Sequence, residues 1–281
     1  TMDALTTGIC NVAIGTNALG ASTTGCHNVA IGDVAMGAGV TTGKYNIAIG
    51  CNTMDALTTG IHNIAMAENA LGASTTGCYN IALGNMAMGV ADTTGINNIA
   101  MGTASMDALT TGACNIAMGI NAYGTAAAGT NNIAIGKTAM GGSLVTGSSN
   151  IAIGTNAADA LLGGACNLAI GGGNTLGQLT IGIFNIALGT SAMANVTTGQ
   201  ADNNIAIGVS ALVGTSSTAG DNNIAIGTTA MDALTSGSCN IAIGQNALGA
   251  STTGGYNIGI GRAVLGGADL TGNENIAIGA D

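Results

Sequence analysis

The sequence predicts an all-β fold, a parallel β-solenoid of about 16 coils. A short pattern of Asn, a branched aliphatic residue, Ala, a second aliphatic residue and Gly recurs sixteen times, at regular intervals of about 17 to 19 residues. Its apolar run is too short for a stable isolated helix, and Ile and Val favour strands. Stacking one such strand per coil at about 4.8 Å explains why the same residue type returns at every turn.

The repeat runs through residues 1–281 as a single array. A longer period lies on top of it, because the phrase around Met-Asp-Ala-Leu returns at Asp3, Asp55, Asp107, Asp159 and Asp232. Each of its first three steps spans three coils, and the last step spans four. Solenoids normally carry atypical capping repeats, and neither end of this array has one. We therefore expect a segment of a longer fibre, or its ordered part.

Side chains alternate across a strand, so the two aliphatic columns of the repeat share one side and the alanine column takes the other. We expect the aliphatic residues, such as Val29 and Ile31, to point into the coil and Ala30 to point outward. An outward column of fifteen alanines and one glycine, Gly259, favours close packing against other copies of the chain. The alternative is that short outward strands simply tolerate alanine.

The columns that flank each strand predict corners. The glycine after the strand, replaced once by Ala67, permits positive φ and a tight turn. Leucines and methionines that occur eight residues after the Asn, such as Leu19 and Met36, are expected to complete the interior. The asparagines are expected to stack as an amide ladder. Its first eight members are Asn11, Asn28, Asn46, Asn63, Asn80, Asn98, Asn115 and Asn132.

The residue just before each ladder asparagine varies and is often large. This column holds both histidines, three of the four tyrosines and the single phenylalanine. Its rings form a possible contact stripe for a neighbouring fibre or a receptor: His27, Tyr45, His62, Tyr79, Phe184 and Tyr256. The alternative is that this corner merely has room for large side chains.

Composition argues against several functions. The net charge is −10 with three Lys and Arg residues, so no nucleic-acid partner is expected, since phosphate binding needs clustered cations. No apolar run approaches the roughly 20 residues of a spanning helix. The seven cysteines lack any C-x-x-C spacing, and we expect free thiols, with an inter-chain bridge or a thiol–metal site as the alternative. No catalytic constellation, resident metal or cofactor is expected, so the chain is predicted not to be an enzyme.

The repeat resembles a known family. The stretch Asn-Val-Ala-Ile-Gly-x-x-Ala-Leu, followed by Thr-Thr-Gly-x-x-Asn, is similar to the head repeats of trimeric autotransporter adhesins, and similar repeats occur in bacteriophage tail fibres. The resemblance covers essentially the whole chain. It implies a left-handed β-roll, a homotrimer and an extracellular position on a cell surface or virion. The coils of this chain are longer than the usual adhesin-head coil.

Several alternatives stay open. Ile14 to Leu19 fits the hexapeptide of left-handed β-helix enzymes, but only one third of each coil obeys that rule. The function expected from the resemblance is an adhesive or structural fibre segment that binds itself and an unknown surface receptor by multivalent contacts. The alternatives are a tail-fibre shaft without an adhesive role, and a monomeric solenoid with an ice-binding or scaffold role, because threonine is abundant.

Overall fold

The structure is a computed structural model that describes residues 1–196, 201–214, 220–267 and 269–280. The chain forms two compact units, residues 1–145 and 146–281, and both are built from the same coil. Unit 1 contains β1 (Val12–Ile14), β2 (Val29–Ile31), β3 (Ile47–Ile49), β4 (Ile64–Met66), β5 (Ile81–Leu83), β6 (Ile99–Met101), β7 (Ile116–Met118) and β8 (Ile133–Ile135). Unit 2 contains β9 (Ile151–Ile153), β10 (Leu168–Ile170), β11 (Ile186–Leu188), β12 (Ile205–Ile207), β13 (Ile224–Ile226), β14 (Ile241–Ile243), β15 (Ile258–Ile260) and β16 (Ile276–Ile278).

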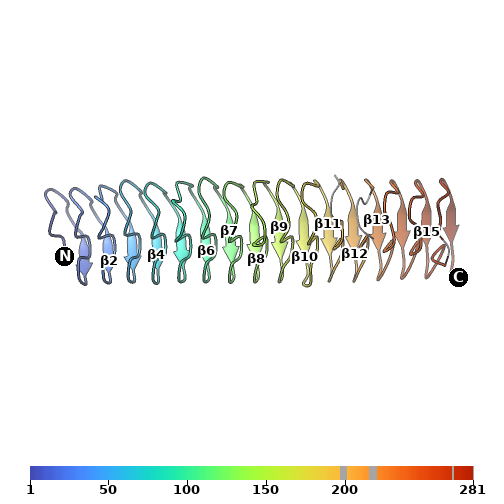
Figure 1. Cartoon of the computed structure of the whole chain (residues 1–281), viewed down its shortest axis with the longest axis horizontal. Coiled ribbons are helices and arrows are strands. Elements are labelled where there is room, and N and C mark those ends of the chain that lie inside the picture. Colours follow the sequence, from blue (N-terminus) through green and yellow to red (C-terminus); the bar gives the residue numbers. More distant parts are fainter. Residues whose placement is uncertain (197–200, 215–219, 268, 281) are drawn as a thin grey trace. The chain divides into compact units, whose positions relative to one another are not determined.

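Within each unit every coil contributes one three-residue strand to a parallel sheet (Figure 1). The register is strict: Val29 pairs with Ile47, Ala30 with Ala48 and Ile31 with Ile49. The same in-register pairing holds where the coil is longer, as between β11 and β12. The prediction of an all-β parallel solenoid is confirmed. None of the described residues forms a helix that could span a membrane.

The coils turn through residues with positive φ. In the second coil these are His27, Gly32, Val34 and Met36, at 57°, 137°, 54° and 51°. The glycine after the strand must also lack a side chain, because a Cβ on Gly15 would clash with the carbonyl oxygen of Gly32 in the next coil. The expected corner glycines are therefore confirmed by both their backbone angle and their stacking.

The interior of each coil is narrow. The leucines and methionines eight residues after the ladder asparagines fill it, and Leu19, Met36 and Met88 have no exposed surface. Tyr123 occupies the equivalent position in one coil and is 1% exposed. The prediction that this column completes the interior is confirmed.

Candidate functional site: the apolar sheet face and its rims

The strands face the opposite way from the expectation. Ala30, Ala48, Ala65 and their equivalents along the described strands are largely buried, most of them completely, whereas the residues on either side of each are partly or largely exposed. The alanines therefore lie inside the coil and the aliphatic residues lie outside. The prediction that Val29 and Ile31 point inward is wrong, and so is the prediction that the alanine column packs against other copies of the chain.

The size of the interior explains this inversion. Gly259 replaces alanine in β15, and a Cβ added there would lie 3.0 Å from Cγ of Leu248 and 3.3 Å from Cγ1 of Val264. The space beneath the strand thus holds no more than a methyl group, because the leucine or methionine from another side of the coil already occupies it. Larger side chains on the strand must point outward, at the cost of exposing apolar surface.

The outward residues form an uninterrupted surface in each unit, here called the apolar face. Its first column contains Val12, Val29, Ile47, Ile64, Ile81, Ile99, Ile116 and Ile133 in unit 1, and Ile151, Leu168, Ile186, Ile205, Ile224, Ile241, Ile258 and Ile276 in unit 2. Its second column contains Ile14, Ile31, Ile49, Met66, Leu83, Met101, Met118 and Ile135, then Ile153, Ile170, Leu188, Ile207, Ile226, Ile243, Ile260 and Ile278. No polar side chain interrupts either column. Exposed fractions within the face are 41% at Met66 and 39% at Ile170, and they reach 59% at Ile14 and 73% at Ile278 in the first and last strands.

Two rims border the apolar face. The N-terminal rim is the residue before each ladder asparagine, and the C-terminal rim is the second residue after each strand. The N-terminal rim runs Cys10, His27, Tyr45, His62, Tyr79, Asn97, Cys114 and Asn131, then Ser149, Cys166, Phe184, Asn203, Asn222, Cys239, Tyr256 and Glu274. The C-terminal rim runs Thr16, Asp33, Cys51, Glu68, Asn85, Thr103, Ile120 and Lys137, then Thr155, Gly172, Thr190, Val209, Thr228, Gln245, Arg262 and Ala280. An apolar surface rimmed by polar residues is typical of a protein interaction site.

The residues of the possible contact stripe lie on the N-terminal rim and are exposed. In unit 1 four of them stack: the ring centroids of His27 and Tyr45 are 5.0 Å apart, those of Tyr45 and His62 are 4.8 Å apart, and those of His62 and Tyr79 are 5.1 Å apart. Each pair is within 10° of parallel. Phe184 and Tyr256 are 56% and 64% exposed on other coils. The stack covers the ring faces and leaves the ring edges outward.

The asparagine ladder runs directly beneath the N-terminal rim. Nδ2 of Asn46 donates to the Gly60 carbonyl at 2.9 Å and to Oδ1 of Asn28 at 3.2 Å. In return, Oδ1 of Asn46 accepts the backbone N–H of Asn63 at 2.9 Å. Equivalent bonds link the other ladder members from Asn11 to Asn132. The ladder therefore fixes the strand entry of one coil to that of the next, and positions the rim above it.

The Met-Asp-Ala-Leu aspartates lie on another side of the coil and are not brought together. Burial raises the pKa of the Asp55, Asp107, Asp159 and Asp232 carboxyl groups above the ordinary aspartate value, and hydrogen bonds from nearby backbone N–H groups partly offset this.

All seven cysteines are free thiols. Among the described residues, no three His, Cys, Asp or Glu side chains gather closely enough to hold a metal ion.

Unit 2 carries two open depressions that share Thr229. One, of about 480 Å³, is lined by Asn195, Ser210, Val213, Gly214, Thr229 and Asp232. The other, of about 360 Å³, is lined by Thr229, Gln245, Asn246, Arg262 and Ala263. The first brings the hydroxyl groups of Ser210 and Thr229 and the Asp232 carboxyl to its walls, and the second brings the Arg262 guanidinium and two side-chain amides.

Comparison with known proteins adds no assignment. No family model matches the chain, and no curated protein matches it. The candidate site therefore rests on the structure alone, and its outstanding feature is the apolar face. Sequence reasoning identified the stripe and the ladder but assigned the apolar columns to the interior, because alternation fixes which residues share a side and not which side faces the core.

Proposed function

We propose that this chain is a segment of an extracellular structural fibre, a shaft or head on a cell surface or virion, in which copies associate through their apolar faces. The observation that carries the proposal is the exposure of the two aliphatic columns. Water penalises such a surface in proportion to its area, and large apolar patches on soluble proteins mark association sites. Covering it with a second copy removes that penalty.

A homotrimer is the assembly we favour. The resemblance to adhesin-head and tail-fibre repeats supports it, since those repeats form three-chain fibres with left-handed coils. Three flat faces turned toward a common axis would bury all six aliphatic columns. The chain also has only three Lys and Arg residues, which leaves trypsin-like proteases few sites to cut. An adhesive role would use the exposed rims and turns, in many copies, to contact a surface receptor.

The mass of the native protein tests the association. Light scattering should give three times the 26.7 kDa of a single chain for a trimer. Met66→Lys with Met101→Lys places two charges on the apolar face and should yield a folded 26.7 kDa monomer. The matched control is Thr59→Lys with Thr94→Lys, which alters exposed turn residues away from the face and should keep the oligomer. A monomeric parent protein at micromolar concentration would refute the proposal.

A second candidate rests on one different observation. In the first seven coils the second threonine of each Thr-Thr-Gly turn is exposed, giving one column: Thr7, Thr24, Thr42, Thr59, Thr76, Thr94 and Thr111. A regular threonine column on a monomeric solenoid would suit an ice-binding or scaffold role. A thermal-hysteresis assay on the monomeric Met66→Lys, Met101→Lys protein tests it, and the absence of hysteresis would remove it.

A further inference from the structure

A ring of copies has a geometric consequence for the rims. In any closed ring whose axis is parallel to the direction of coil stacking, all strands run around the axis in the same sense. The end of a strand in one copy then points at the start of a strand in its neighbour. The C-terminal rim of each copy therefore faces the N-terminal rim of the next. This step rests on the proposed association through the apolar face.

The two rims match coil by coil. Both histidines of the chain lie on the N-terminal rim, at His27 and His62. The C-terminal rim has only two acidic residues, Asp33 and Glu68, and they belong to the same two coils. All four side chains are exposed. A neutral imidazole can donate its N–H to a carboxylate, and a protonated one adds an opposite charge.

The other charged positions fit the same pairing. Arg262 shares its coil with Tyr256, a pair suited to a cation–π contact. Lys137 shares its coil with Asn131, and Glu274 shares its coil with Ala280. No coil places like charges on its two rims. Like charges facing each other across an interface would oppose association.

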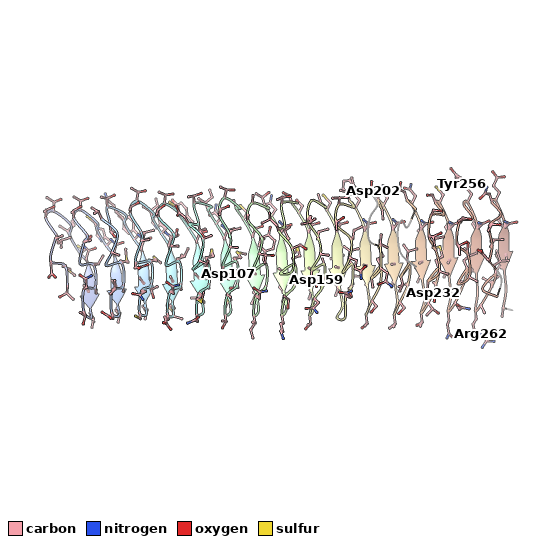
Figure 2. All side chains as sticks on the ribbon, viewed as in Figure 1. Asp107, Asp159, Asp202, Asp232, Tyr256 and Arg262 are labelled. Atoms are coloured by element: carbon pink, nitrogen blue, oxygen red, sulfur yellow. The ribbon has the colours of Figure 1, made fainter. Side chains whose placement is uncertain are left out.

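Contact within one chain does not explain the match. His27 and Asp33 are six residues apart and are separated by an extended strand, which places them on the order of 15–20 Å apart. In unit 2 the corresponding residues Tyr256 and Arg262 lie at opposite edges of the coils (Figure 2). Within the chain, Glu68 instead accepts a hydrogen bond from Nδ2 of Asn85 at 3.2 Å, and His27 and His62 stack on Tyr45.

We infer that copies of the chain assemble in axial register, so that each coil's N-terminal rim contacts the C-terminal rim of the same coil in the neighbouring copy. His27 then meets Asp33 and His62 meets Glu68 across the interface. Tyr45 meets Cys51, and Tyr256 meets Arg262. The rims thus select the register, whereas the nearly uniform apolar face would tolerate a shift by one coil.

A disulfide trap tests the register. The parent for the test retains Cys51 and carries Ser at Cys10, Cys26, Cys78, Cys114, Cys166 and Cys239. Tyr45→Cys introduces a thiol in the same coil on the opposite rim. Tyr79→Cys introduces one two coils away, about 9.6 Å along the stack at about 4.8 Å per coil. Disulfides need Cα atoms within about 7 Å. Mild oxidation should therefore cross-link the Tyr45→Cys chains into covalent multimers and leave the Tyr79→Cys chains as single chains on non-reducing gels.

Two controls make the outcome decisive. Equal maleimide labelling of both introduced thiols in the reduced proteins shows that they are equally accessible. Light scattering shows whether each variant keeps the parent's mass. Oligomers in which Tyr79→Cys cross-links as well as Tyr45→Cys, or in which neither does, overturn the register while leaving the association intact. A monomeric parent overturns both.

A charge swap provides an independent test. His62→Glu sets two glutamates against each other in one coil of the interface and should raise the dissociation constant a few-fold, as expected for exposed charge pairs. Adding Glu68→His restores opposite partners across the interface and should recover the parent affinity. If the double variant is as weak as the sum of its single variants, the two positions do not meet.

Discussion

The phenol hydroxyl of Tyr123 accepts a 2.7 Å hydrogen bond from Nδ2 of Asn132 inside unit 1. Other ladder amides donate to a backbone carbonyl, as Asn115 does to Gly129 at 2.8 Å, and in most coils leucine or methionine fills the interior position that Tyr123 occupies. A tyrosine can therefore enter this narrow core because its ring has the reach to bring the hydroxyl to the ladder.

Replacing Tyr123 with phenylalanine should destabilise unit 1 by about 1 kcal/mol, the usual value of one buried hydrogen bond. Urea unfolding followed by circular dichroism measures the change. Tyr256→Phe is the matched control, because that ring is 64% exposed and its substitution should change little. Equal losses from the two variants would contradict a special role for the Tyr123 hydroxyl.

Tyr123 should also make stability fall at alkaline pH. Burial raises the pKa of its hydroxyl above the ordinary tyrosine value, and the Asn132 hydrogen bond offsets this only in part. A pKa that is higher in the folded than in the unfolded chain stabilises the protein below the unfolded value, near pH 10, and this stability is lost as the pH rises further. The unfolding midpoint of the parent should therefore drop above about pH 10 more steeply than that of Tyr123→Phe. Parallel curves would refute the prediction.

Ala67→Gly should stabilise the protein. Ala67 has φ of 103°, a region that favours glycine, and it is the one alanine in the column of corner glycines. Relief of strain worth about 1–3 kcal/mol exceeds the roughly 0.4–1 kcal/mol that glycine costs through the unfolded chain. The reciprocal control is Gly50→Ala, whose Cβ would lie 2.7 Å from the Ala67 carbonyl carbon and should destabilise strongly. A lower melting temperature for Ala67→Gly would show that the site is unstrained.

Removing one ladder amide should affect three coils. Asn63 donates from Nδ2 to Asn46 at 3.1 Å and to the Gly77 carbonyl at 2.7 Å, and its Oδ1 accepts the backbone N–H of Asn80 at 2.9 Å. Asn63→Ala should cost about 3 kcal/mol, since buried polar groups lose partners. Hydrogen exchange should quicken at the Asn80 amide, which loses its acceptor. The exposed Asn97→Ala provides the comparison and should cost no more than about 1 kcal/mol.

The aspartates of the longer period should be slightly destabilising at neutral pH. Burial raises the pKa of Asp55 and Asp107, so the folded state binds protons more tightly than the unfolded state does. Their contribution is fully present below about pH 4 and is lost as the pH rises through the folded pKa. Asp55→Asn with Asp107→Asn should therefore raise the melting temperature at pH 7 but not at pH 3. Because the side chains are partly solvated, the gain should be only a few tenths of a kcal/mol per site.

The sequence was sufficient for the coil and its corners, because those depend on local rules. Local backbone conformation determines three features: the regular spacing of the repeat, its short β-branched strands and its corner glycines such as Gly15. Which side of the strand points into the coil depends on the volume left in the interior, as beside Leu248 and Val264. The local sequence pattern does not contain this information. The stripe at His27 could be found from its side-chain size, but its proposed contact with Asp33 of a neighbouring copy could not, since the two residues lie on opposite edges of one chain.

The register of the sheet is independent of the length of the turn. Strands β2 and β3 pair as strictly as β1 and β2, although their coil is one residue longer, and the residues of such turns, Val40 and Val90, are 55% and 57% exposed. The strand side of the coil therefore keeps a fixed number of residues, whereas the turn side accepts insertions. A lineage of such solenoids could therefore gain coils by duplication and vary its outer turns while the apolar face stays unchanged. The length of the solenoid and the residues of its turns would then evolve independently of the apolar face.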